Sequence, residues 1–230
     1  MEFHTWEPVY EGILDDFGYP RDGDERARDC FVELLGDDRT YNPTSLGLDG
    51  ATVAVAGAGP SLEAEAGRAV DADVVLAAST AADRLRAEGV AVDCMVTDLD
   101  KNADTGRELT AAKTPVVAHA HGDNIPALET HIPAYDSEFV VPTTQAGPSP
   151  PVRNYGGFTD GDRAAFLADH FGAGSLVFPG WDFEDPSVTA EKRQKLRWAE
   201  RLLHWLEQRR GERFDVLDGR RDDIEPVATD

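Results

Sequence analysis

The chain has 230 residues, enough for one sizeable domain, and 41% of them are hydrophobic, which excludes a globally disordered protein. Its 44 acidic residues outnumber 22 basic ones and give a net charge of −22. This excess of acid argues against nucleic acid or an anionic membrane as a partner.

Only four of the basic residues are lysines, and two cysteines are too few for a disulfide framework or a structural zinc site. An acidic, lysine-poor folded chain suggests a halophilic protein, because salt shortens the Debye length and weakens self-repulsion. The alternative is an ordinary acidic cytosolic protein. No apolar run reaches the roughly 18 residues of a membrane span, and the N-terminus lacks a signal pattern, so we expect a cytoplasmic protein.

Two amphipathic helices are predicted at the start of the chain. Their apolar residues recur at helical spacing over Trp6–Phe17 and Asp24–Leu35. Asn42-Pro43 then breaks the helical pattern. We expect residues 1–48 to form an N-terminal helical segment. The sequence leaves open whether this segment packs on the rest of the chain or on a second subunit of a homo-oligomer.

From residue 49 to residue 217, short apolar runs alternate with helical segments, which we interpret as an α/β catalytic domain with a long C-terminal helix. The predicted strands are Thr52–Ala56, Val74–Ala78, Cys94–Thr97, Pro115–Ala118, Phe139–Val141 and Leu176–Phe178. The predicted helices are Leu62–Val70, Ala81–Glu88, Ile125–His131, Ala164–Phe171 and Thr189–Arg210. This alternation predicts a Rossmann-like, mostly parallel sheet with helices on both faces. Residues 218–230 are expected to form an acidic tail.

Unusual polar segments follow four of the predicted strands. An open parallel sheet binds its ligand outside the carboxyl ends of its strands, so these segments are informative. They are Gly57-Ala58-Gly59-Pro60-Ser61, Thr97-Asp98-Leu99-Asp100, His119-Ala120-His121-Gly122-Asp123-Asn124 and Gly180-Trp181-Asp182. Their common placement predicts one ligand site at one edge of the sheet.

The first segment has glycines where a strand turns into a helix. Gly57-x-Gly59 is the pattern that lets backbone N–H groups approach a phosphate. Leu62 stands where the dinucleotide fingerprint has its third glycine, which disfavours an NAD-dependent oxidoreductase. A plain tight turn is the other interpretation, and the motif alone does not decide between them.

Charged and imidazole side chains are paired in the next two segments. If the chain is extended there, Asp98 and Asp100 point the same way while Leu99 faces the core. Two close carboxylates repel unless a cation joins them, and Mg²⁺ takes such ligands together with water and phosphates. His119 and His121 have the same spacing and are candidates for metal ligation or for hydrogen bonds to a phosphate.

Arg163 adds a cation in the first turn of a predicted helix. A positive charge gains nothing from the helix dipole there, which indicates an anionic partner.

In this order, the segments resemble those of the archaeal 6-hydroxymethyl-7,8-dihydropterin pyrophosphokinases, which share a fold-level likeness with thiamin pyrophosphokinases. The resemblance runs from Asn42 to about Leu206. Besides the segments above it includes Asn42-Pro43-Thr44-Ser45-Leu46, Thr143-Thr144-Gln145, residues 154–163 and Lys195-Leu196-x-Trp198-Ala199. The chain departs from the family at Lys101, where glycine is usual, and this lysine could supply a phosphate-binding cation.

The resemblance implies transfer of the terminal diphosphate of ATP to the hydroxyl of a reduced pterin, with release of AMP, in folate or methanopterin-type cofactor biosynthesis. Mg²⁺ would be held by Asp98 and Asp100, and His121 and Asp160 are the candidate bases. The residues implied in nucleotide or phosphate binding are Gly57, Gly59, Ser61, Lys101 and Arg163. Those implied in substrate binding are His119, Asp123, Asn124, Gln145 and Asp182.

Three other functions are compatible with parts of the pattern. A metal hydrolase would use His119-x-His121-x-Asp123, although Asn124 replaces the last histidine of the binuclear zinc motif. A nucleotide-sugar transferase would use Asp98-x-Asp100 to bind a metal. A non-catalytic nucleotide-binding module would leave the paired carboxylates and histidines unexplained.

Overall fold

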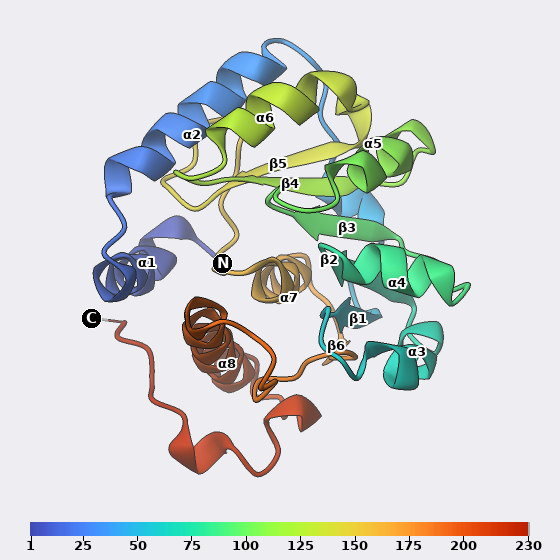
Figure 1. Ribbon diagram of the computed structural model, residues 1–230, viewed down its shortest axis with the longest axis vertical. Helices are drawn as coiled ribbons and strands as arrows, with labels where there is room; N and C mark the ends of the chain where they lie inside the picture. Colours follow the sequence, from blue (N-terminus) through green and yellow to red (C-terminus); the bar gives the residue numbers. More distant parts are fainter. Residues whose placement is uncertain (230) are drawn as a thin grey trace.

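A computed structural model describes residues 1–229, and residue 230, the last of the expected acidic tail, lies outside the described residues. Its centre is a parallel sheet of six strands in the order β5-β4-β3-β2-β1-β6 (Figure 1). The strands are β1 (Thr52–Ala56), β2 (Val74–Ala78), β3 (Cys94–Thr97), β4 (Val116–Ala120), β5 (Val140–Thr144) and β6 (Ser175–Val177). The predicted α/β fold is confirmed.

Helices cover both faces of this sheet, as expected for strands that are apolar on both sides. They are α1 (Phe3–Phe17), α2 (Arg21–Leu35), α3 (Leu62–Val70), α4 (Ala81–Ala87), α5 (Ala103–Ala111), α6 (Ile125–His131), α7 (Asp160–His170) and α8 (Ala190–Arg210). Short 3-10 helices lie at Pro43–Leu46, Ile132–Ala134, Ser137–Phe139, Asp215–Leu217 and Arg221–Asp223. Helices α2 to α6 cover one face, and α1, α7 and α8 cover the other (Figure 1).

Alternate residues of each strand enter two separate hydrophobic cores. In β1, Val53 and Val55 belong to the core beneath α1, α7 and α8. Ala54 and Ala56 belong to the core beneath α2 to α6. This period-two alternation is what a strand buried on both faces requires.

The N-terminal helices pack on the sheet of their own chain. Trp6 of α1 is fully buried, with its ring 5.9 Å from that of Phe166 in α7 and 6.4 Å from that of Trp205 in α8. Phe31 of α2 is fully buried in the opposite core. The question that the sequence left open is therefore answered in favour of intramolecular packing. None of the described helices combines the length and the apolar character needed to cross a bilayer.

One helix was missed, and several predicted bounds differ from the structure, among them the starts of α1, α2 and α7 and both ends of β6. Helix α5 was not predicted because few apolar residues mark it. In the structure it packs against Tyr135, which comes close to the helix at Gly106 and whose hydroxyl donates to the Ala103 carbonyl at 2.7 Å. Strand β4 continues to Ala120, and β5 spans 140–144 instead of 139–141. The proline at position 142 is the reason that β5 was predicted to end at residue 141. A proline is tolerated inside β5 because β5 is an edge strand.

Candidate active site

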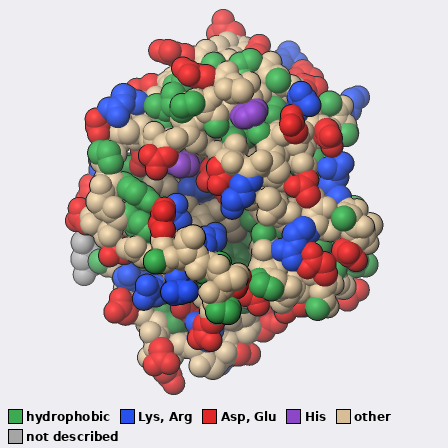
Figure 2. All heavy atoms as spheres, in the orientation of Figure 1, with side chains coloured by type: hydrophobic (Ala, Val, Ile, Leu, Met, Phe, Trp, Pro, Cys, Tyr) green, Lys and Arg blue, Asp and Glu red, His purple; other side chains and the backbone are tan. Residues whose placement is uncertain are grey.

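A pocket of about 570 Å³ lies at the carboxyl ends of the strands, where the first turns of α7 and α8 meet the sheet. Figure 2 shows this hollow with basic side chains around it, while acidic side chains are spread over the surrounding face. The expected site residues that line it are Gly59, Asp98, Asp100, Lys101, His121, Asp123, Gln145, Asp160, Arg163 and Asp182. Those that do not line it are Gly57, Ser61, His119 and Asn124.

Asp98 and Asp100 are presented by a tight turn after β3. Leu99 has a φ of 68°, in the left-handed region, so the condition of an extended chain at these residues is not met. The Leu99 N–H donates to Thr97 Oγ1 at 2.9 Å, and the Asp100 N–H donates to Asp98 Oδ1 at 3.3 Å. Leu99 is buried, as expected. A bulky residue in this conformation is strained, and such strain concentrates at functional sites.

The two carboxylates differ in their affinity for a proton. Burial opposes the ionisation of Asp98, but hydrogen bonds to His121 and Asp100 outweigh it and lower its pKa. His121 Nε2 lies 3.6 Å from Asp98 Oδ2. Burial, together with the hydrogen bond to Asp98 and its negative charge, raises the pKa of Asp100. Two carboxylates that repel each other at the edge of a pocket fit a hard divalent cation whose other positions take water and phosphate oxygens.

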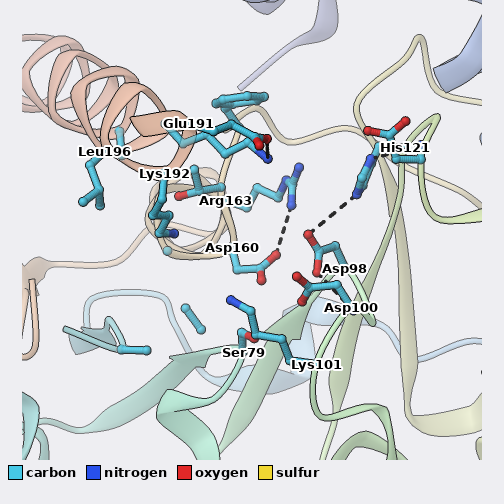
Figure 3. A pocket seen from close by; sticks show the side chains of 18 of the residues that line it. Ser79, Asp98, Asp100, Lys101, His121, Asp160, Arg163, Glu191, Lys192 and Leu196 are labelled. Atoms are coloured by element: carbon cyan, nitrogen blue, oxygen red, sulfur yellow. Dashed lines mark hydrogen bonds and ion pairs between the residues drawn. The ribbon is translucent and has the colours of Figure 1, made fainter. Parts of the chain in front are cut away.

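Asp160 and Arg163 form an ion pair at the start of α7 (Figure 3). Arg163 Nη1 lies 3.0 Å from Asp160 Oδ1, and its Nη2 donates to Gln145 Oε1 at 3.2 Å. Burial, reinforced by the negative charge of Asp98, raises the pKa of Asp160 to about 7. A carboxylate with such a pKa is suited to exchange protons near neutral pH.

Asp24 was missed by the sequence analysis. Its side chain is buried, and it lines the pocket from α2. Asp24 accepts hydrogen bonds from the Tyr10 hydroxyl and the Gly122 N–H, each at 2.7 Å, and thereby ties both N-terminal helices to the turn after β4. The sequence did contain a signal for Asp24. This acidic residue lies on the same helical stripe as Ala27 and Phe31, where an apolar residue is expected.

Lys192 and Lys195 were also missed; they line the pocket from α8. Helix α8 was predicted, and Lys195 was among the residues that carry the family resemblance, but neither lysine was assigned to the site.

His119 and Asn124 hold the strand ends instead of lining the pocket. His119 is buried in β4, with Nδ1 3.0 Å from Thr143 Oγ1. Burial, followed by the charge of Arg163, keeps its pKa well below the usual value, so the ring is neutral. The Asn124 amide donates to the carbonyls of Asp98 at 2.8 Å and His119 at 2.7 Å. Both residues lie behind the pocket lining and position the strand ends, and their expected contact with substrate stays a prediction.

The glycine turn after β1 is built for contact with the segment after β6. Gly57 N–H donates to the Pro179 carbonyl at 2.9 Å, and Gly59 N–H donates to the Gly180 carbonyl at 2.8 Å. A Cβ at Gly57 would lie 2.6 Å from the Gly180 oxygen. These amides are already engaged, so the tight-turn interpretation accounts for both glycines.

Ser61 and Asp182 complete the same connection. The Ser61 N–H and hydroxyl both donate to Asp182 Oδ2, at 2.9 and 2.8 Å. In this turn Ala58 and Gly59 line the pocket, and the phosphate contact expected of Gly57 and Ser61 stays a prediction that their existing hydrogen bonds do not favour.

The hydrolase alternative is not favoured by this geometry. His121 and Asp123 line the pocket, whereas His119 is buried in β4 and bonded to Thr143. Within residues 1–229, no group of three or more His, Cys, Asp or Glu side chains is arranged to hold a metal ion. The motif His119-x-His121-x-Asp123 therefore does not form one ligand set.

Comparison with known proteins gives one consistent result. Residues 38–187 match the family model described as 6-hydroxymethylpterin diphosphokinase MptE-like. Relatives from Methanothermobacter thermautotrophicus and Pyrococcus furiosus are 37% and 35% identical over 90% of this chain, covering 96% and 94% of their own lengths. A third, from Methanocaldococcus jannaschii, is 30% identical over 91% of this chain and 97% of its own. All three are named 6-hydroxymethyl-7,8-dihydropterin pyrophosphokinase. The chain belongs to the MptE-like 6-hydroxymethylpterin diphosphokinase family.

Proposed function

We propose that the protein transfers the terminal diphosphate of ATP to the hydroxyl of 6-hydroxymethyl-7,8-dihydropterin and releases AMP. The proposal is carried by one observation. Two acidic and two basic residues line the same pocket in a chain of this family: Asp98, Asp100, Lys101 and Arg163. Acidic groups suited to a cation and basic groups suited to phosphate are what diphosphate transfer requires.

In this reaction the hydroxyl oxygen of the pterin attacks the β-phosphorus of ATP. A new oxygen–phosphorus bond forms, the bond from the β-phosphorus to the oxygen shared with the α-phosphate breaks, and AMP leaves with that oxygen. The hydroxyl proton needs an acceptor. We assign this role to Asp160, because it lines the pocket and burial raises its pKa to about 7. His121, the other candidate, lies against Asp98.

Charge neutralisation falls to a few groups. Asp98 and Asp100 would hold Mg²⁺, which when bound offsets the negative charge of the phosphates. Lys101 and Arg163 would contact phosphate oxygens, with Arg163 oriented by Asp160 and Gln145. The remaining contribution of the protein is to hold the hydroxyl and the β-phosphorus in line.

The test is incubation with ATP, Mg²⁺ and 6-hydroxymethyl-7,8-dihydropterin, with the nucleotide products separated by chromatography. We expect AMP and pterin diphosphate in equal amounts, no product without the pterin, and loss of activity with EDTA that excess Mg²⁺ reverses. Formation of ADP would contradict the reaction. Turnover of a UDP-sugar or CMP-sugar in place of ATP would favour the transferase alternative.

A further inference from the structure

The lysines of this chain are concentrated at the pocket. Three of the four, Lys101, Lys192 and Lys195, line it, whereas Lys113 is exposed after α5. The other basic residues are arginines. Lysine carries a compact charge on a flexible stem and binds phosphate as a point charge, without the fixed fork of arginine. This distribution places three ammonium groups at the pocket in which a phosphate chain would be held.

In the part of the chain that the structure describes, two of these lysines have no acidic partner. Lys195 Nζ lies 3.1 Å from Glu191 Oε1, so its charge is already balanced. Among residues 1–229, neither Lys101 nor Lys192 lies within ion-pair distance of a carboxylate. Acidic residues outnumber basic ones two to one in this chain, 44 against 22, so unpaired cations facing a shared pocket indicate a site for an anionic ligand.

Lys192 lies where a helix disfavours a positive charge. It occupies the first turn of α8, and its backbone N–H donates to the capping Thr189 hydroxyl at 3.2 Å. The partial positive charge of a helix N-terminus repels a cation. Lys192 is exposed as a whole residue, but the protein atoms around its ammonium group, followed by the charge of Lys101, lower its pKa. An anion bound between the two ammonium groups would offset the repulsion of Lys192 by the helix N-terminus and by the charge of Lys101.

The two ammonium groups approach the pocket from different elements. Figure 3 shows Lys101 reaching in from the turn after β3 and Lys192 from α8, with Asp160 nearby and the carboxylates of Asp98 and Asp100 on the side of the sheet. If a cation at Asp98 and Asp100 binds a triphosphate, the phosphate charge that the cation does not neutralise would therefore face these lysines.

We propose that Lys192 binds the phosphate chain of ATP together with Lys101, so that the first turn of α8 forms one wall of the nucleotide site. The matched part of the family model ends at residue 187, before this helix begins. The inference rests on the proposed function, because that function supplies the triphosphate. It adds a binding residue that comes from the C-terminal helix and not from the strand ends.

The test compares two neighbouring charge removals on α8, Lys192→Met and Arg193→Met. Arg193 lies in the same turn but does not line the pocket. The dissociation constant of α,β-methylene ATP with Mg²⁺ is measured by calorimetry at one fixed salt concentration, and that of the reduced pterin is measured separately. We expect Lys192→Met to weaken nucleotide binding about tenfold or more, since hydrogen bonds to charged groups have this strength. Pterin binding should stay unchanged, Arg193→Met should bind like the wild type, and Lys192→Arg should restore most of the affinity.

Two results would overturn the assignment of Lys192. One is wild-type nucleotide affinity in Lys192→Met; the other is an equal loss in Lys192→Met and Arg193→Met, which would reflect net charge alone. Binding of the analogue needs no turnover. If the wild type binds α,β-methylene ATP but forms no AMP from ATP and the pterin, the proposed function fails. The comparison of Lys192→Met with Arg193→Met still decides the inference about Lys192 in that case.

Discussion

Two carboxylates from one turn carry the cation site that we propose. Replacing Asp98 or Asp100 by Asn leaves the shape of the turn but removes a negative charge that the cation needs. We expect AMP formation to fall on the order of a hundredfold or more, while a thermal melt shows that each variant is still folded at the assay temperature. Asp104→Asn is the control, since Asp104 pairs with Arg107 on the surface of α5 and does not line the pocket. Wild-type turnover in both site variants would exclude the cation assignment.

The raised pKa of Asp160 predicts a pH dependence of stability. The folded protein favours its protonated form, so the stability that this group contributes is complete below its ordinary pKa of 3.8 and is lost as pH rises through about 7. The free energy of unfolding of the wild type, minus that of Asp160→Asn, should therefore fall between pH 4 and pH 7, by at most about 4 kcal/mol.

This difference is measured by urea denaturation without nucleotide or Mg²⁺. Subtracting the variant removes the titration of the carboxyl groups that do not interact with Asp160, because these behave alike in both proteins. A difference that grows with pH over this range would show that the pKa of Asp160 is lowered in the folded state, and Asp160 would then be a poor candidate for the proton acceptor.

At the scale of elements, the junction between the ends of β1 and β6 depends on glycine. A Cβ at Gly59 would collide with the Asp182 carboxylate and lie 2.7 Å from the Gly180 oxygen. We expect Gly59→Ala to lower the free energy of unfolding by about 1–3 kcal/mol, the usual cost of overpacking.

Gly67→Ala on α3 is the matched control. Its Cβ would meet nothing within 4 Å, and the position is inside a helix. There alanine should stabilise the protein by about 0.5–1 kcal/mol. Equal stability of the two variants in chemical denaturation would contradict the tight junction that the structure describes.

For the whole molecule, the net charge of −22 predicts a strong dependence on salt. Like charges on the surface repel, and raising the salt from about 0.1 M to about 1 M shortens the Debye length from about 10 Å to about 3 Å. We expect the urea midpoint to rise over this range of KCl, and to rise less near pH 5, where the net charge is smaller. A midpoint that falls with KCl would argue against the salt-adapted surface that we propose.

Several features followed from the sequence by itself, because they depend on residues close together in the chain. The apolar runs give β1, β2 and β3 their observed bounds, and the polar segments after β1 and β3 lie within the residues that match the family model. Period-two and period-3.6 patterns are local, and a parallel sheet necessarily collects its strand ends at one edge.

Other features were decided only by the tertiary structure, because they are contacts between distant residues. Ser61 and Asp182 are 121 positions apart, yet their hydrogen bonds occupy the turn that the sequence offered to a phosphate. Asp24 and Lys192 come from the first and last parts of the chain, and only the packing of α2 and α8 brings them to the pocket. No local pattern encodes which helix ends meet, since the packing of the whole core determines it.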